Sequence, residues 1–460
     1  MSDLSITVHG MKFDNPFVLG SGPPGTNGKV IARSFDLGWG GMVCKTFSLD
    51  ASKVINTAPR YAKLRGRTSE EVIGFENIEL ISDRPYADWI DDLTQLKKQY
   101  PNKILIASIM EEYRKEAWQQ IVREVQATGV DGFELNLSCP HGLPERKMGM
   151  AMGENPDIVE EVVGWVKGVS KIPVWAKMTP NVGDVTASPK AAVASGAHGI
   201  SAINTILSVV GIDLDTLRPM PTVEGYTTPG GYSGQAVRPI ALRHVMEILR
   251  GVPGTPVSGM GGIYTGADAA QFVALGCHTV QVCTGAMLQG YQVIKDLCEG
   301  LIAVLDKHGF ESLDQLRGVA LRRSVGEVFA VDPIHADDPH RALALAGLLR
   351  DHDDLHGLGH VHVVLLPPVV EGPGHHRVLL HELGRLAVDL HALADAGDPV
   401  VAGLAEVGIG GLARVGARLG LGDDGRLGFG GLGGLGLARR GTGNSEHDEH
   451  AGQQTTHAAS

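Results

Sequence analysis

Paired cysteines, long apolar runs and a surplus of basic residues are all missing from this sequence of 460 residues. The five cysteines, Cys44, Cys139, Cys277, Cys283 and Cys298, form no CxxC pair, so neither a disulfide framework nor a zinc site is indicated. No apolar run approaches the roughly 18 residues of a membrane span, and the N-terminus, MSDLSITVHG, lacks the pattern of a secretory signal. A net charge of −12 argues against a nucleic-acid partner. We therefore expect a cytoplasmic protein.

The C-terminal part of the chain lacks whole residue types. Lysine, cysteine, methionine, tryptophan and tyrosine are absent from the last 140 residues, which hold 13 of the 19 histidines. Segments such as GLGDDGRLGFGGLGGLGLARRG have no steady period and almost no aromatic residues from which to build a core. We interpret residues 321–460 as a low-complexity tail, either disordered or translated out of frame, and infer no function from it.

Residues 15 to 310 alternate between short apolar runs and amphipathic patterns. Stretches 116–129 and 156–169 have apolar residues at helical spacing, and such stretches separate the strand candidates. Strand and helix in alternation indicate right-handed βαβ units, and eight of them predict an α/β fold of the (β/α)8 TIM barrel type over residues 1–320. A doubly wound open sheet is the weaker alternative, since no GxGxxG motif opens a helix after the first strand. The predicted strands are 16–20, 40–47, 104–110, 132–138, 173–179, 199–205, 256–263 and 279–285.

Two connections, residues 48–102 and 206–255, are much longer than the others. In a barrel both would emerge at the C-terminal ends of the strands, where active sites of this fold lie. We expect them to cover a ligand there.

The segment ELNLSCPHG (134–142) ends a buried strand with a cluster of polar and ionisable side chains. Asn136 can donate and accept hydrogen bonds, and Cys139 carries a proton whose affinity depends on its surroundings. Taken alone, the segment also fits a strand end with a buried structural cysteine.

Glycine-rich turns follow the last two predicted strands, in SGMGGIYTG (258–266) and QVCTGAM (281–287). Glycine lets backbone N–H groups approach a phosphate closely, and such turns in a barrel are a frequent phosphate site. The candidate phosphate ligands are Gly261, Gly262, Thr284 and Gly285.

Two lysines and three asparagines stand at strand ends or in the long connections. Lys45 and Lys177 would be costly to bury without an anion or an electron-rich acceptor, and a lysine near N1 of a flavin would stabilise the anionic reduced ring. Asn77, Asn136 and Asn204 offer amides that suit a flat ligand with alternating C=O and N–H groups, as in a pyrimidine.

These motifs, in this order, resemble the FMN barrel of dihydropyrimidine dehydrogenases, and more distantly that of dihydroorotate dehydrogenases. The resemblance covers roughly residues 3 to 320 and includes KTFSLD, GFENIELIS, ELNLSCPHG, AKMTPN and GYSGQAVRPIALR. It implies an NAD-dependent enzyme that interconverts uracil or thymine with the 5,6-dihydropyrimidine. Hydride would pass between FMN N5 and ring C6, and a proton would move at C5.

The resemblance also implies roles for particular residues. Cys139 would be the general acid/base, with Ser138 and His141 in the same loop. The pyrimidine would be held by Asn77, Glu79, Asn136, Asn204 and Thr205, and FMN by Lys45, Thr46, Lys177, Gly234, Gly262 and Thr284. Glu79 favours a neutral pyrimidine over orotate, because a carboxylate beside the ligand would repel the carboxylate of orotate.

One departure from the family concerns electron supply. The family's catalytic subunit usually continues into a ferredoxin-like domain with two 4Fe–4S clusters and receives electrons from an NAD/FAD-binding reductase subunit. Those clusters need closely spaced cysteines, and this chain contains none. The departure motivates a hypothesis of another class, a non-catalytic subunit that binds FMN or a phosphate ligand without electron input.

Overall fold

Eight parallel strands close into a barrel in the order β10-β15-β16-β3-β4-β7-β8-β9, which confirms the predicted (β/α)8 fold. The computed structural model describes residues 2–140 and 147–323. The predicted tail, residues 321–460, therefore lies outside the described residues except for its first three. The barrel strands are β3 (Phe17–Leu19), β4 (Gly41–Val43), β7 (Ile104–Ile109), β8 (Gly132–Asn136), β9 (Val174–Lys177), β10 (Gly199–Ala202), β15 (Val257–Met260) and β16 (Thr279–Val282).

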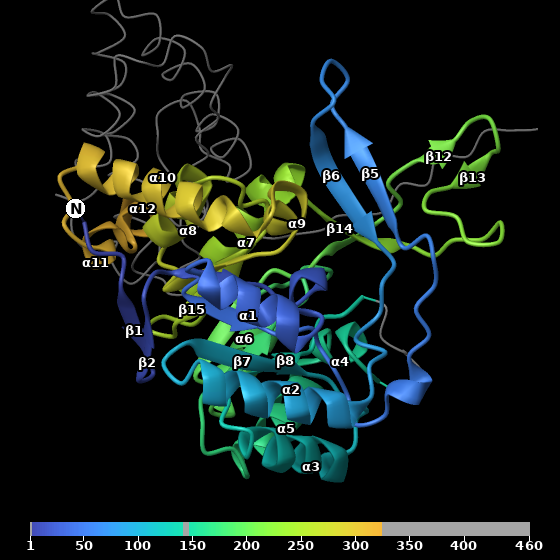
Figure 1. Ribbon diagram of the computed structural model, residues 1–460, viewed down its shortest axis with the longest axis horizontal. Helices are drawn as coiled ribbons and strands as arrows, with labels where there is room; N and C mark the ends of the chain where they lie inside the picture. The colour runs from blue at the N-terminus through green and yellow to red at the C-terminus, as the bar shows by residue number, and fades with distance from the viewer. Residues whose placement is uncertain (1, 141–146, 324–460) are drawn as a thin grey trace, which may run out of the picture. The chain divides into compact units, whose positions relative to one another are not determined.

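An α-helix separates each barrel strand from the next and packs on the outside of the barrel (Figure 1). Helix α5 shows how the sequence sets such an element: Asn155 caps its first turn by accepting from the N–H of Asp157, and Pro156 occupies the first position, where no N–H is needed. Its apolar stripe is buried. These helices are α1 (Gly28–Asp36), α2 (Tyr86–Gln99), α3 (Lys115–Gln126), α5 (Pro156–Lys167), α6 (Ala187–Ala194), α7 (Arg238–Gly251), α8 (Gly266–Leu275) and, after β16, α10 (Ile294–Lys307).

Shorter elements complete the barrel. The hairpin β1 (Ile6–Val8) and β2 (Met11–Phe13) precedes the first barrel strand, and its Phe13 packs against Gly41 at the start of β4. The remaining helices are α4 (Met150–Gly153), α9 (Thr284–Gln289), α11 (Leu313–Leu316) and α12 (Val319–Arg323). None of the described helices is long and apolar enough to cross a membrane.

The two long connections meet in a second, four-stranded antiparallel sheet, which the sequence did not predict. Strands β5 (Tyr61–Arg65) and β6 (Val72–Asn77) come from the first connection, and β11 (Ile206–Ser208) and β14 (Gly230–Ser233) from the second. They pair in the order β11-β14-β6-β5, with Gly231 opposite Asn77. A two-stranded hairpin, β12 (Ile212–Asp213) and β13 (Arg218–Pro219), lies between β11 and β14 along the chain. This hairpin and the one formed by β5 and β6 project beyond the ring of helices (Figure 1).

The inside of the barrel carries polar as well as apolar side chains. Strand β8 is buried along its whole length, although it includes Glu134 and Asn136. Because successive side chains of a strand point to opposite faces, these two lie on the same face. This alternation places polar groups at the C-terminal end of the barrel, where the strands end.

Candidate active site

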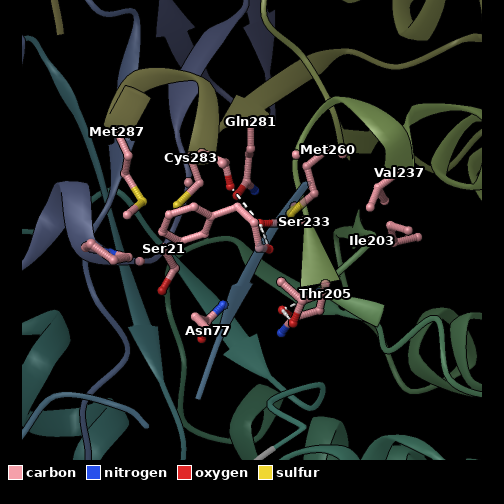
Figure 2. A pocket seen from close by; sticks show the side chains of 18 of the residues that line it. Ser21, Asn77, Ile203, Thr205, Ser233, Val237, Met260, Gln281, Cys283 and Met287 are labelled. Atoms are coloured by element: carbon pink, nitrogen blue, oxygen red, sulfur yellow. Dashed lines mark hydrogen bonds between the residues drawn. The ribbon is translucent and has the colours of Figure 1, made fainter. Parts of the chain in front are cut away.

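A cavity opens at the C-terminal ends of the barrel strands, beneath the four-stranded sheet. Figure 2 shows side chains from the barrel and from this sheet, among them Asn77, Thr205, Gln281 and Cys283, around one space. The predicted site residues that line it are Lys45, Thr46, Asn77, Glu79, Asn136, Cys139, Lys177, Asn204, Thr205, Gly234, Gly261, Gly262, Thr284 and Gly285. Of the other two, Ser138 does not line the cavity and His141 lies outside the described residues.

Hydrogen-bonded side chains connect the C-terminal ends of β4, β8 and β10 at the base of the cavity. Asn136 Nδ2 donates to Thr46 Oγ1 at 2.9 Å, and Asn136 Oδ1 accepts from the Ser138 hydroxyl at 3.0 Å. Asn204 Nδ2 in turn donates to Ser138 Oγ at 2.7 Å, and Asn204 Oδ1 accepts from the backbone N–H of Thr205 at 2.7 Å. Ser138 thus joins two of the predicted substrate-binding asparagines and fixes which amide atoms they present to the cavity.

Lys45 is paired with the carboxylate of Glu79. The distance from Lys45 Nζ to Glu79 Oε2 is 2.8 Å, and Arg60 Nη1 lies 3.1 Å from the other carboxylate oxygen. Glu79 follows strand β6 and Arg60 precedes strand β5, so this ion pair ties the covering sheet to the barrel. Glu79 therefore lines the cavity with its negative charge compensated by two cations.

Lys177 ends strand β9 and faces a different carboxylate. Its Nζ lies 3.5 Å from Glu134 Oε1, inside the barrel, where both side chains are buried. Glu134 Oε2 accepts from Gln281 Nε2 at 2.7 Å. No second anionic partner of Lys177 is found in the described part of the chain.

Cys139 lies in apolar surroundings at the edge of the cavity. Its side chain packs with Ile81, Met110 and Met148 in a small cluster separate from the main core. The backbone carbonyl of Cys139 accepts from the N–H of Met150 at 3.0 Å, which anchors the segment that follows β8. These contacts shield the thiol from bulk water while leaving it on the cavity wall.

The turns after β15 and β16 depend on glycine. Gly262 has φ of +72°, and a side chain there would bring Cβ within 2.9 Å of the Arg238 backbone nitrogen. At Gly285 a Cβ would lie 2.5 Å from the Ile263 carbonyl oxygen, so the two turns touch each other. The Thr284 hydroxyl is within 2.8 Å of the Ser233 hydroxyl, which brings strand β14 to the same corner. The predicted phosphate ligands are thus held together at one end of the cavity.

Several cavity residues were not identified from the sequence. Burial raises the pKa of the Cys283 thiol to about 11, against the opposing effect of Lys177 and Lys45, and it raises the pKa of Tyr264 to about 12. Both groups are therefore neutral near pH 7. Polar residues at alternate positions 279, 281 and 283 could have indicated the role of β16, whereas Tyr61, Phe75 and Tyr232 of the covering sheet left no comparable signal. The missed residues include Ser21, Tyr61, Phe75, Tyr232, Ser233, Tyr264, Gln281, Cys283 and Met287.

Comparison with known proteins gives consistent matches over the barrel. Residues 3–305 match the family model described as dihydroorotate dehydrogenase. The chain is 54% identical over 329 residues to the chloroplastic dihydropyrimidine dehydrogenase (NADP(+)) of Arabidopsis thaliana, covering 70% of this chain and 77% of the plant protein. It is 43% identical over 321 residues to the NAD-dependent dihydropyrimidine dehydrogenase subunit PreA of Escherichia coli (strain K12), covering 69% and 77%.

Among solved structures, the chain is similar in fold to Eimeria tenella DHODH crystallised in complex with ferulenol. The TM-score is 0.59 with 18% sequence identity, over 70% of this chain and 89% of that one.

Proposed function

Because this chain belongs to the dihydroorotate dehydrogenase family, and within it to the NAD(P)-dependent dihydropyrimidine dehydrogenases, we propose that it interconverts uracil or thymine and the 5,6-dihydropyrimidine. The observation that carries the proposal is the placement of Cys139 on the wall of a cavity that also holds Asn77, Glu79, Asn136, Asn204 and Thr205. A thiol supplies a proton, and the amides and hydroxyls match the alternating C=O and N–H groups of a pyrimidine edge.

The cavity also fits FMN. Two buried polar atoms on or beside its wall, Gln281 Oε1 and Tyr264 Oη, have no hydrogen-bond partner among the described residues, and such atoms are costly unless a ligand satisfies them. Lys45, Thr46 and Lys177 would lie with the ring system, and Gly234, Gly261, Gly262, Thr284 and Gly285 with the phosphate. When bound, FMN exchanges hydride at its N5 with C6 of the pyrimidine.

The protein's own residues position the substrate and move the proton. Asn136 and Asn204, fixed by their shared contact with Ser138, would hold the pyrimidine, together with Asn77, Glu79 and Thr205. Cys139 would give the proton to ring C5 during reduction and take it back during oxidation. The apolar cluster around Cys139 would exclude water that could otherwise deliver this proton.

We expect the purified chain to carry noncovalent FMN and not FAD. The paired turns after β15 and β16 would hold the terminal phosphate of FMN, whereas FAD would need room for an adenylate beyond them. Denaturing the protein and identifying the released flavin by chromatography tests this expectation. Release of FAD, or a colourless protein that does not take up added FMN, would contradict it.

Electron supply is proposed to come from outside the chain. The Escherichia coli relative is by its name a subunit of an NAD-dependent enzyme. We accordingly infer that NAD(H) acts through a reductase partner subunit. The described residues contain no closely spaced cysteines that could hold iron–sulfur clusters.

Orotate is the competing substrate, and the structure bears on the choice. Glu79 lines the cavity, but Lys45 and Arg60 compensate its charge. Glu79 therefore repels the carboxylate of orotate less strongly than an unpaired carboxylate would. We still expect a preference for the neutral pyrimidine, of about tenfold or more, because burying the carboxylate of orotate requires a cation of its own.

Single-turnover experiments measure this preference without a partner subunit. The FMN-loaded protein is photoreduced without oxygen and mixed with uracil or orotate, and flavin reoxidation is followed by absorbance. Faster reoxidation by uracil is the expected result. Faster reoxidation by orotate would indicate dihydroorotate dehydrogenase activity instead, and no reoxidation by either pyrimidine would favour a non-catalytic flavin-binding subunit.

A further inference from the structure

Glu134 is a buried carboxylate for which the proposed reaction has no direct use. It lies in the middle of strand β8, between Ser108 on one neighbouring strand and Trp175 on the other, with 1% of its surface exposed. Burying a carboxylate inside a barrel is costly unless it is paired and hydrogen-bonded. The partners of Glu134 therefore indicate what it does.

Glu134 is held from one side by a chain of neutral polar groups. Gln281 donates to its Oε2 at 2.7 Å, and the same Gln281 nitrogen lies 3.3 Å from the hydroxyls of Ser201 and Ser258. Thr279 donates to Ser258 at 2.7 Å and continues the chain along β16. These contacts orient the carboxylate but leave its charge uncompensated.

The only cation that faces Glu134 in the described residues is Lys177. Their separation of 3.5 Å is longer than the 2.8 Å between Lys45 and Glu79. It is also longer than the roughly 2.7–2.9 Å of a charge-assisted hydrogen bond. Glu134 thus offsets the charge of Lys177 without occupying all of its N–H donors. Lys177 lines the cavity, so those donors remain available to a ligand.

We propose that Glu134 is a positioning residue that acts through Lys177 to limit how strongly the cavity favours the reduced, anionic flavin. This inference rests on the proposed function, since it requires FMN beside Lys177. A positive charge near N1 of the flavin stabilises the reduced ring. With Glu134 in place, the pair presents donors but almost no net charge. Without the carboxylate, an uncompensated ammonium faces the ring.

Glu134→Gln is the direct test, because it removes the charge and keeps the shape and an oxygen that can accept from Gln281. Sulfite is the probe, since it adds to oxidised flavin and leaves a negative charge on the ring. We expect the sulfite Kd of the FMN-loaded variant to fall at least tenfold. The flavin reduction potential, measured by dye equilibration, should rise correspondingly, by about 30 mV for a tenfold change in a two-electron couple. An unchanged Kd and potential in a variant that binds FMN would overturn the proposal.

A charge-neutral pair of substitutions keeps the proposal testable if Glu134→Gln does not fold. Replacing a buried ion pair by neutral residues is usually tolerated better than removing one partner. Lys177→Met alone should weaken sulfite binding at least tenfold, and Glu134→Gln with Lys177→Met should return it to near the wild-type value. If the double variant binds sulfite as weakly as Lys177→Met alone, Glu134 has no such influence.

These measurements need bound flavin but no turnover. A wild-type chain that takes up no FMN would contradict the proposed function. A wild-type chain that binds FMN and is reoxidised by uracil, with variants that leave sulfite affinity unchanged, would contradict only the role of Glu134.

Discussion

Replacing Cys139 by alanine is expected to slow reoxidation of the photoreduced flavin by uracil about 10²–10⁴-fold, the usual contribution of a positioned acid. FMN content and uracil affinity should persist, because the side chain packs with Ile81, Met110 and Met148 and alanine removes little volume there. Stopped-flow absorbance measures the rate, and equilibrium titration of the oxidised protein measures uracil binding.

Two further substitutions make this experiment specific. Cys139→Ser should restore only part of the rate, because a hydroxyl holds its proton far more tightly than a thiol does. Cys298→Ala, on helix α10 and outside the cavity lining, is the matched control for loss of a thiol and should react at the wild-type rate. A Cys139→Ala protein with near-normal reoxidation would remove the acid assignment from this residue, and His141 would become the next candidate.

The second large effect is expected at Gly262. Alanine there would adopt a left-handed backbone, at a cost of roughly 1–2 kcal/mol. Its Cβ would also lie 2.9 Å from the Arg238 nitrogen and 3.0 Å from the Gln235 carbonyl, both backbone atoms that cannot rotate away. The turn must therefore shift, which would displace the backbone groups proposed to hold the phosphate. We expect the Kd for FMN to rise about 100-fold, or about 2.8 kcal/mol, as measured by flavin fluorescence titration.

Gly254→Ala separates the conformational cost from the clash. Gly254 has φ of +79°, close to the +72° of Gly262, but a Cβ there would meet nothing within 4 Å. This control should lose stability in thermal unfolding while binding FMN as the wild-type chain does. Equal FMN affinities for the two variants would show that the turn after β15 does not contact the cofactor.

The barrel could be predicted from the sequence because its strands are short apolar runs at regular intervals. The run ILIASIM, for example, contains strand β7, which is buried along its full length. A parallel strand covered on both faces leaves this continuous apolar signal. Polar residues that interrupt the end of such a run, as Asn136 does, then mark the side of the barrel that holds the site.

The covering sheet could not be predicted in the same way. Strands β5 and β14 are five and four residues long and only partly buried. Strand β5 pairs with the nearby β6, but β14 pairs with β6 across 154 residues, with Gly231 opposite Asn77. Their stability depends on cross-strand contacts, which no local pattern records. For this reason Tyr61, Phe75 and Tyr232 were missed, although each lines the cavity. Glu134 was missed for another reason: its place in an apolar strand gave no indication that its partner is Lys177.

The pairing of β6 with β14 also determines when the cavity can form during synthesis of the chain. Asn77 donates to the carbonyl of Gly231, 154 residues further along the chain. Bringing these two residues together before the intervening chain has folded would cost much conformational entropy. The contact therefore forms only once most of the barrel strands between them are in place. A ribosome-bound fragment that ends before β14 would contain Cys139 and both lysines but not the completed cavity. We therefore expect cofactor uptake to be a late event, after synthesis of nearly the whole barrel, so that nascent chains do not sequester free flavin.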